Sequence, residues 1–167
     1  MSGKQKIKNI LDQNVEAYAR RTLFFANAND SVITAAKVMQ ENGVESVIVR
    51  ENDAPVGILT IKDLIFRVIS KGLDPEKVTV SSVMSSPLIT IKTSDTLKTA
   101  LNIMKRNNIR RILVLDKDGK PYGLIVLKRL AGDIINKYTQ FEEKPISWPQ
   151  DYIREVTDYE LQHHSHD

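Results

Sequence analysis

The sequence predicts a mixed α/β (α+β) fold in which two β-α-β-β-α repeats pack together as a pseudo-two-fold pair within one chain. Three observations support this prediction. Residues 23–64 and 88–130 resemble each other, each copy alternates helical and strand-like apolar patterns, and neither copy is long enough to bury a large core alone. The copies align with an offset of 65 residues at Asp30/Asp95, Ala35/Ala100, Met39/Met104 and Val49/Val114, and of 66 residues at Pro55/Pro121, Gly57/Gly123 and Leu64/Leu130.

Each copy shows the patterns of a helix, a strand, a turn, a second strand and a second helix. In the first copy, apolar residues recur at helical spacing behind the candidate N-caps Asp30 and Ser31, and Asn42-Gly43 supplies a stop signal. Gly72 supplies the second stop signal. The expected elements cover residues 32–39, 46–50, 51–53, 56–59 and 62–71 in the first copy, and 97–104, 111–115, 117–119, 122–126 and 128 to about 138 in the second.

Segments outside the repeats complete the expected organisation. Apolar residues at helical spacing predict an amphipathic helix over Ile7–Tyr18, and the run Val80–Met84 predicts one or two helical turns. After Tyr138 the chain becomes polar. We therefore expect an N-terminal helical segment, a first repeat, a linker with the lead of the second repeat, a second repeat and a polar tail, over residues 1–21, 22–72, 73–87, 88–138 and 139–167.

Composition argues against several classes of protein. A hydrophobic content of 41% and a charged content of 27% are ordinary for a globular protein, and no apolar run approaches the roughly 18 residues of a spanning helix. The chain has no cysteine, which excludes disulfides, and its N-terminus has no apolar stretch of signal-peptide length. We therefore expect a cytoplasmic protein with no membrane partner. A net charge of +3 argues against nucleic acid as a partner.

One motif carries a candidate binding chemistry. Gly57 lies in a predicted strand, Thr60 closes that strand, and Asp63 falls in the first turn of the following helix. Such a junction favours a phosphate through its free N–H groups and the helix dipole, and an ionised carboxylate accepts both hydroxyls of a ribose diol. The motif therefore suits a ribonucleotide. It is also close to a capping box, which needs no ligand and is the stronger interpretation when the motif is considered alone.

The second copy shifts this balance toward ligand binding. At the positions of Thr60 and Asp63 it has Val126 and Arg129, so the fold does not require a hydroxyl and a carboxylate at this junction. The leads into the repeats also differ, because residues 20–22 are Arg-Arg-Thr where residues 85–87 are Ser-Ser-Pro. Since the second junction lacks a ribose acceptor, we expect it to be empty or to hold something other than an ordinary nucleotide.

Positive charge is concentrated in the second copy. Glu45 and Ser46 occupy the first-copy positions of Arg110 and Arg111. A composite site between the copies would need this division, with the diol acceptor in one copy and the cations in the other. The alternative is an ordinary solvated basic face. The basic group consists of Arg110, Arg111, Lys128 and Arg129.

Together these features resemble a tandem pair of CBS domains, the arrangement called a Bateman module. The resemblance covers roughly residues 22–136 and rests on the Gly57–Asp63 motif, the two β-α-β-β-α units and the Val83–Pro87 lead. It implies a stand-alone regulatory, energy-sensing module that binds AMP, ADP or ATP in one intact cleft between the repeats. An S-adenosyl compound is the other ligand that the resemblance allows.

The resemblance also implies roles for individual residues. Asp63 would take the ribose and Thr60 the phosphate, while Ile58 and Ile89 would contact the base. Alternation along the strand sends the side chains of Arg110 and Arg111 to opposite faces, so at most one is expected to point at the phosphate. We favour Arg111, with Arg110 at the rim, because Arg110 lies before the strand. The full set expected to bind the nucleotide is Ile58, Thr60, Asp63, Ser86, Leu88, Ile89, Arg110, Arg111 and Lys128.

No catalytic machinery is visible in the sequence, so we expect a binding protein and not an enzyme, with no cofactor beyond its nucleotide ligand. No metal site is expected, although His163, His164 and His166 lie in the tail, where Trp148 is expected to act as an anchor. Two other functions stay open. One is a scaffold with a vestigial site, and the other is a nucleic-acid-binding module that uses the basic group.

We also expect a homodimer, with an unknown regulated protein as a further partner. The resemblance implies that two chains form a flat disc of four repeats. Two apolar helix faces exceed what one pair of repeats is expected to bury, and the N-terminal helix would add to the contact. These faces are Leu64/Ile65/Val68 and Leu130/Ile134/Ile135.

Overall fold

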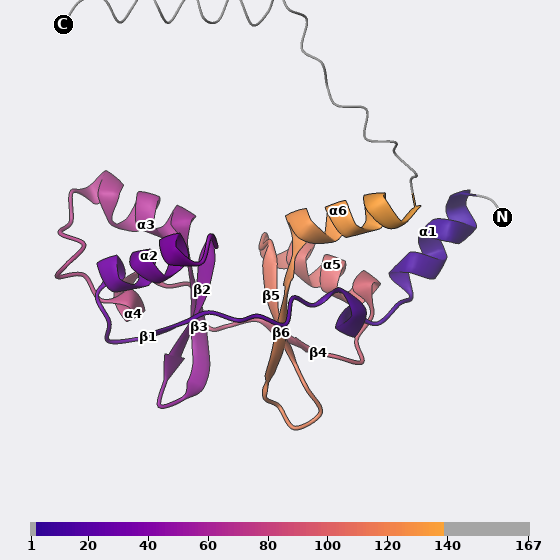
Figure 1. The fold of residues 1–167 in the computed structure, drawn as a ribbon, viewed down its shortest axis with the longest axis horizontal. Coiled ribbons are helices and arrows are strands. Elements are labelled where there is room, and N and C mark those ends of the chain that lie inside the picture. Colours follow the sequence, from indigo (N-terminus) through magenta and orange to yellow (C-terminus); the bar gives the residue numbers. More distant parts are fainter. Residues whose placement is uncertain (1–2, 139–167) are drawn as a thin grey trace, which may run out of the picture. The chain divides into compact units, whose positions relative to one another are not determined.

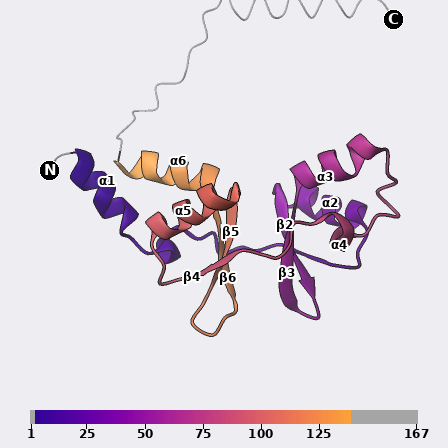
Figure 2. The same ribbon diagram turned by 180° about the vertical axis from the view of Figure 1, so that it is seen from behind.

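The computed structural model describes residues 3–138, so the expectations for Trp148 and the three histidines lie outside the described residues. Residues 1–133 form one compact unit that contains both repeats, and a second unit begins at Ile134. Each repeat has one three-stranded sheet, and the helices of that repeat lie on one side of it (Figure 1 and Figure 2). The fold is α+β and is built from two similar repeats, which confirms the predicted class.

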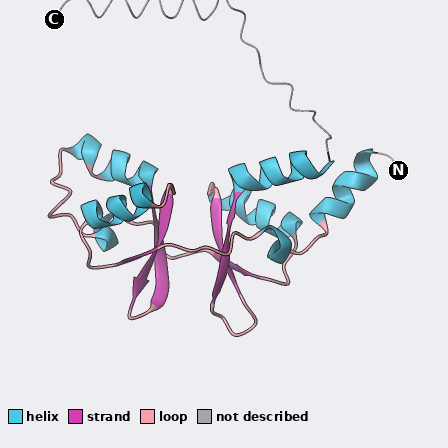
Figure 3. Cartoon of the chain, viewed as in Figure 1, coloured by secondary structure: helices cyan, strands magenta, loops and turns pink. Residues whose placement is uncertain are grey.

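The elements follow the predicted order in both repeats (Figure 3). The first repeat contains β1 (Phe25–Asn27), α2 (Val32–Glu41), β2 (Ser46–Glu51), β3 (Ala54–Thr60) and α3 (Ile61–Arg67), followed by the 3₁₀-helix η2 (Ile69–Lys71) and α4 (Val80–Val83). The second repeat contains β4 (Thr90–Lys92), α5 (Leu97–Asn107), β5 (Arg111–Leu115), β6 (Pro121–Val126) and α6 (Leu127–Tyr138). Before them come α1 (Gly3–Leu11) and the 3₁₀-helix η1 (Val15–Tyr18).

The two sheets share one topology and one irregularity. β1 is parallel to β2, and β2 is antiparallel to β3. β4, β5 and β6 repeat this arrangement. The antiparallel register shifts between Val49 and Arg50 in the first sheet and between Val114 and Leu115 in the second. Because the 65-residue offset relates these positions, the repeat extends to the details of the backbone.

The hairpin turns explain why the offset changes from 65 to 66 residues. In the first repeat, Asn52 and Asp53 have φ angles of 48° and 64°, as the two central residues of a tight hairpin turn require. In the second repeat, the N–H of Asp116 donates to the carbonyl of Lys120 at 2.8 Å. The Oδ1 atom of Asp116 also accepts from the N–H groups of Asp118 and Lys120, each at 2.9 Å. This turn encloses residues 117–119 and is one residue longer.

The N-terminal segment packs on the second repeat. The predicted single helix over Ile7–Tyr18 is wrong, because α1 ends at Leu11 and Asn14 is extended where it bridges Thr96. The N–H of Val15 donates to the carbonyl of Asp95 at 2.8 Å, and the Val15 side chain is fully buried. Pairing with the second repeat therefore interrupts the helical pattern.

Two side chains assigned to dimer faces are buried inside the repeats. The predicted helix over residues 62–71 is broken at Val68, whose φ of −120° and ψ of −66° end α3. The side chain of Val68 is 1% exposed, and that of Leu130 is 2% exposed. Both belong to the cores of their repeats and offer no surface to a partner. Gly72 ends η2 as predicted, with a φ of 64°.

Candidate functional site

The segment that leads into each repeat lies against the last strand of the other repeat. Ile58 of β3 and Ser85 exchange two backbone hydrogen bonds of 3.0 and 2.9 Å. Leu124 of β6 and Arg20 exchange two bonds of 3.0 Å each. The repeat offsets relate these two bridges, so each strand-to-helix junction carries a lead at the same position.

Close approach of the leads explains the glycine in each of these strands. A Cβ atom on Gly57 would lie 2.6 Å from the Sδ of Met84 and 2.9 Å from the carbonyl oxygen of Ser85. A Cβ atom on Gly123 would lie 2.9 Å from the Cβ of Ala19 and 2.9 Å from the carbonyl oxygen of Arg20. Both glycines therefore keep space for a lead to cross, whether or not a ligand binds.

The junction between β3 and α3 contains a complete capping box. The N–H of Asp63 donates to Oγ1 of Thr60 at 3.3 Å, and the N–H of Thr60 donates to Oδ2 of Asp63 at 2.9 Å. The hydroxyl of Thr60 also donates to Oδ2, at 2.7 Å. The capping interpretation of this motif is therefore correct, and these two side chains stabilise the start of α3.

The two oxygens of Asp63 have different surroundings. Oδ2 accepts both bonds from Thr60, whereas Oδ1 has Oγ of Ser85 and Nε of Arg67 at 3.5 Å each. Arg67 also donates through Nη1 to the carbonyls of Val83 and Met84, at 2.7 and 2.8 Å. Asp63 is 8% exposed. Capping therefore uses one oxygen fully, and the other keeps most of its capacity to accept hydrogen bonds.

Of the two residues expected to contact the base, Ile58 lies in β3 and Ile89 lies in the lead of the second repeat. Ile58, Leu88 and Ile89 are half-buried, and Ser86 is exposed. Ile58 is placed directly beside the lead by its bridge to Ser85. The structure thus brings an apolar strand residue and the lead to the junction that holds Thr60 and Asp63.

Arg111 is held by a carboxylate of the first repeat. Its Nη2 donates to Oε2 of Glu45 at 2.7 Å, and its side chain is 17% exposed. Arg110 is exposed and precedes β5, as predicted. Its carbonyl accepts a hydrogen bond from the N–H of Leu127 at 2.9 Å, which ties it to the start of α6. The guanidinium of Arg111, which was expected to face a phosphate, is thus already paired with Glu45.

Two of the expected cations line a hollow at the second junction. The hollow has a volume of about 350 Å³, and Thr60 and Asp63 are not part of its lining. The structure therefore groups Arg111 and Lys128 with the junction that lacks a ribose acceptor. The lining consists of Arg20, Gly43, Val44, Glu45, Ser46, Arg111, Val126, Lys128 and Arg129.

Arg20 has an unusual environment in this hollow. Burial lowers the pKa of its guanidinium, and the positive charges of Arg129 and Arg111 lower that pKa further. Its Nε atom is buried with no hydrogen-bond partner among the residues that the structure describes. Its guanidinium carbon lies 5.6 Å from the centre of the Phe24 ring.

The repeat offsets relate this hollow to an equivalent position at the first junction. The position so defined contains the expected ribose acceptor, the lead of the second repeat and both expected arginines. Neither Arg20 nor Glu45 belonged to the expected nucleotide-binding set. Applying the offset to that set finds Glu45, the equivalent of Arg110, but not Arg20, because its equivalent Ser85 was not in the set. The offsets map Arg20, Glu45, Ser46, Val126 and Arg129 onto Ser85, Arg110, Arg111, Thr60 and Asp63, respectively.

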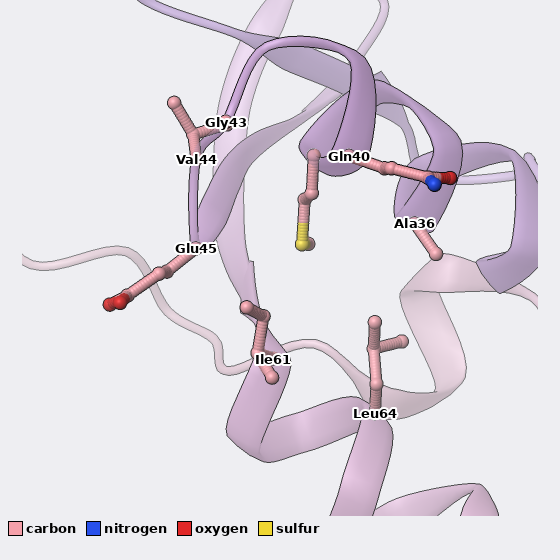
Figure 4. Close-up of a pocket in the computed structure, with 8 residues that line it drawn as sticks. Ala36, Gln40, Gly43, Val44, Glu45, Ile61 and Leu64 are labelled. Atoms are coloured by element: carbon pink, nitrogen blue, oxygen red, sulfur yellow. The ribbon is translucent and has the colours of Figure 1, made fainter. Parts of the chain in front are cut away.

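A second hollow lies between α2 and α3 and is mostly apolar. It has a volume of about 370 Å³, and Ala36 and Leu64 face it from the two helices, whereas Glu45 points away (Figure 4). Large apolar side chains of α3 and η2 are exposed nearby in the chain. Those side chains are Ile61, Ile65, Phe66 and Ile69.

Two other kinds of feature are absent from residues 3–138. No helix in this range is both long and apolar enough to cross a membrane. The same range holds no group of three or more His, Cys, Asp or Glu side chains that could hold a metal ion.

Comparison with known proteins identifies the repeats. The CBS domain family model matches residues 15–70 and 80–136. An uncharacterized protein of Methanopyrus kandleri is 34% identical over 116 residues, which cover 69% of this chain and 59% of that protein. The chain therefore spans about six tenths of the length of that relative.

Solved structures agree with this assignment. The crystal structure of a conserved protein from Pyrococcus horikoshii has a TM-score of 0.68 and 30% identity, over 74% of this chain and 93% of that one. A putative signal-transduction protein with CBS domains from Burkholderia ambifaria has a TM-score of 0.66 and 26% identity, over 78% of this chain and 93% of that one. The chain belongs to the CBS domain family and contains two such domains in tandem.

Proposed function

We propose that the chain is a regulatory module that binds an adenine nucleotide at the first junction and does not convert it. The observation that carries the proposal is the burial and the incomplete hydrogen bonding of the Asp63 carboxylate. Its carboxylate is 8% exposed, and only Oδ2 is fully engaged in the helix cap. Because both neighbours of Oδ1 lie at 3.5 Å, this oxygen keeps acceptor capacity that a ligand can use.

Oδ1 of Asp63 is the acceptor for the ribose diol in this proposal. Ser85 and Arg67 approach it only to 3.5 Å, so hydroxyl donors from a ribose can form shorter bonds. Arg67 balances the negative charge and fixes the lead through its bonds to two carbonyls. Helix capping therefore orients the carboxylate that binds the sugar.

The base and the phosphate take opposite ends of the junction. The half-buried side chains of Ile58, Leu88 and Ile89 supply apolar contact for adenine, and Ser86 lies in the same lead. Arg110 and Arg111 supply charge for the phosphate, because the offset relates them to Glu45 and Ser46, which line the hollow at the second junction. Lys128 lines the hollow at the second junction together with Arg111 and adds positive potential.

Phosphate binding and contact between the repeats are linked in this scheme. A phosphate that engages Arg111 competes with Glu45 for the same guanidinium, and that ion pair joins the two repeats. A ligand shifts an equilibrium only through different affinities for two states. When Arg111 releases Glu45 and binds a phosphate, the contact between the repeats changes. This change of partner is the regulatory step that we propose.

Titration calorimetry with AMP, ADP, ATP, adenosine and S-adenosylmethionine tests the proposal. We expect one strong nucleotide site per chain. Asp63→Asn should weaken nucleotide affinity by at least about 100-fold, because two hydrogen bonds to a charged acceptor contribute about 1.5–3 kcal/mol each. Asp53→Asn is the matched control, since the side chain of Asp53 is 94% exposed in the β2–β3 turn. If none of these compounds bound at millimolar concentration, the proposal would be wrong.

A second pair of titrations separates phosphate recognition from packing. Arg111→Ala should weaken AMP by roughly tenfold and leave adenosine unchanged, because only AMP carries the charge that the guanidinium meets. Arg106→Ala is the control, since Arg106 is an exposed arginine on α5 and does not line the hollow that contains Arg111. Equal weakening of AMP and adenosine would mean that Arg111 acts through packing.

We further propose that the module works as a homodimer. The apolar hollow between α2 and α3 and the exposed side chains of Ile65, Phe66 and Ile69 form a surface suited to a second copy of the chain. Light scattering should show twice the chain mass of 18.9 kDa. Phe66→Glu should shift the protein toward the monomer, and a wild-type monomer at micromolar concentration would reject the dimer.

A further inference from the structure

The hollow at the second junction has the charges of an anion site. Four cationic side chains line it against the single carboxylate of Glu45. We propose that this hollow binds a small phosphate-type oxyanion with two or more negative charges, such as pyrophosphate, and that it does not recognise a nucleoside. Such an anion would occupy the space between Arg20, Arg111, Lys128 and Arg129.

Arg20 supplies an observation that does not depend on the count of charges. Its Nε is buried, and among the described residues it has no hydrogen-bond partner. A buried donor without a partner costs free energy, and the cost is larger for a charged group. Since Arg20 lines the hollow, an oxyanion bound there lies beside this guanidinium, and a small rotation of the side chain would let the anion accept from Nε.

Mutual repulsion gives a second reason for an anion at this place. Arg129 and Arg111 both act on the charge of Arg20, and burial weakens the solvent screening that would reduce this repulsion. The partner of Arg129 is distant, because its Nε lies 3.9 Å from Oδ2 of Asp133. An oxyanion among the three guanidinium groups would replace repulsion with charge-assisted hydrogen bonds.

The side chains at this junction also exclude the sugar contacts proposed for the first. Val126 stands at the position of Thr60 and has no hydroxyl. Arg129 stands at the position of Asp63, and a guanidinium has donors but no acceptor for a ribose diol. The ligand is therefore recognised by its charge and its oxygen atoms.

Glu45 competes with the ligand in this arrangement. Its carboxylate holds Nη2 of Arg111 at 2.7 Å, so an anion must share or displace it. Removing the charge of Glu45 should therefore strengthen anion binding, whereas removing a cation should weaken it. Opposite effects at two residues of one hollow distinguish a specific site from loss of folding.

The test is calorimetric titration of the full chain with pyrophosphate, in a phosphate-free buffer at constant ionic strength. Arg129→Ala should weaken binding at least tenfold, and the control Arg106→Ala should change it less than twofold. Glu45→Gln should strengthen binding about threefold or more. Equal effects of the two arginine substitutions, no strengthening by Glu45→Gln, or no binding of pyrophosphate at millimolar concentration would each overturn the proposal.

Two further titrations separate this site from the nucleotide site. Pyrophosphate and ADP are titrated into Asp63→Asn, which removes the proposed ribose acceptor. Pyrophosphate should bind this variant as it binds the wild type, and ADP should bind more weakly than pyrophosphate. Loss of pyrophosphate binding in Asp63→Asn would assign the anion to the first junction and overturn the second site, whatever the outcome for AMP.

Discussion

At the first junction β3 delivers Thr60 and Asp63 to the start of α3, and at the second β6 delivers Val126 and Arg129 to the start of α6. Both strands end under a lead, which is held by two backbone hydrogen bonds in each case. The first junction carries a buried carboxylate inside a capping box, and the second opens on a hollow lined by cations. The same backbone arrangement therefore presents a negative side chain at the first junction and positive side chains at the second.

This difference separates what the fold needs from what a ligand needs. The glycines and the crossing leads occur at both junctions, so they belong to the architecture. The hydroxyl and the carboxylate occur at one junction only, although α6 forms without them. Side chains that differ between equivalent positions are thus the stronger candidates for recognition.

The largest effect is expected when the second junction is given the side chains of the first. The double substitution Val126→Thr/Arg129→Asp changes the charge of the hollow by two units and supplies a capping box. Pyrophosphate affinity should fall by at least about 100-fold, because one charged hydrogen bond is lost and a repulsion is added. Titration calorimetry with pyrophosphate measures this change.

The single substitution Val126→Thr is a control that separates the effect of charge from the effect of packing. Val126→Thr alone should leave pyrophosphate affinity within about threefold, because it changes no charge. If the single substitution were as damaging as the double one, packing and not charge would govern the hollow, and the comparison between the junctions would lose its basis.

Much of the fold followed from the sequence because the repeat supplies each element twice. The strand predicted over residues 111–115 coincides with β5, and the predicted turns at 51–53 and 117–119 occur where expected. The N-terminal helix was predicted too long, because its second half is extended against the second repeat around Asn14 and Val15. A contact between residues far apart in sequence overrides local periodicity, and no local pattern reports it.

The site was predicted only in part, for the same physical reason. Local spacing identified Thr60 and Asp63 as a pair, and the structure confirms their mutual hydrogen bonds. Local spacing could not show that Arg111 is paired with Glu45, 66 residues away, or that Arg20 enters the cationic hollow. The roles of the expected residues in nucleotide binding stay predictions.

An intermediate effect is expected from filling the space under each lead. Gly57→Ala and Gly123→Ala should each lower the free energy of unfolding by about 1–3 kcal/mol, because the new Cβ would press on the backbone of a lead. Gly132→Ala is the control. Nothing lies within 4 Å of a Cβ atom at Gly132, and alanine is favoured over glycine inside a helix. Chemical denaturation measures all three changes.

The two glycine variants should also differ in binding. Gly57→Ala displaces the lead at Ser85 and should weaken AMP more than pyrophosphate. Gly123→Ala displaces the lead at Arg20 and should weaken pyrophosphate more than AMP. Identical loss of both ligands in both variants would show that the junctions do not act as separate sites.

The smallest effect concerns helix capping alone. Thr60→Val removes the hydroxyl that caps α3, and losing such a cap typically costs about 1 kcal/mol of stability. Val126→Thr adds a hydroxyl at the equivalent position before α6 and should add about 0.5 kcal/mol by the same bond. For a chain of this size, 1 kcal/mol shifts the melting temperature by about 2–4 °C, so thermal unfolding resolves both signs. If Val126→Thr destabilised the protein, the position before α6 would not accept a cap, and the second junction would differ from the first in backbone as well as in charge.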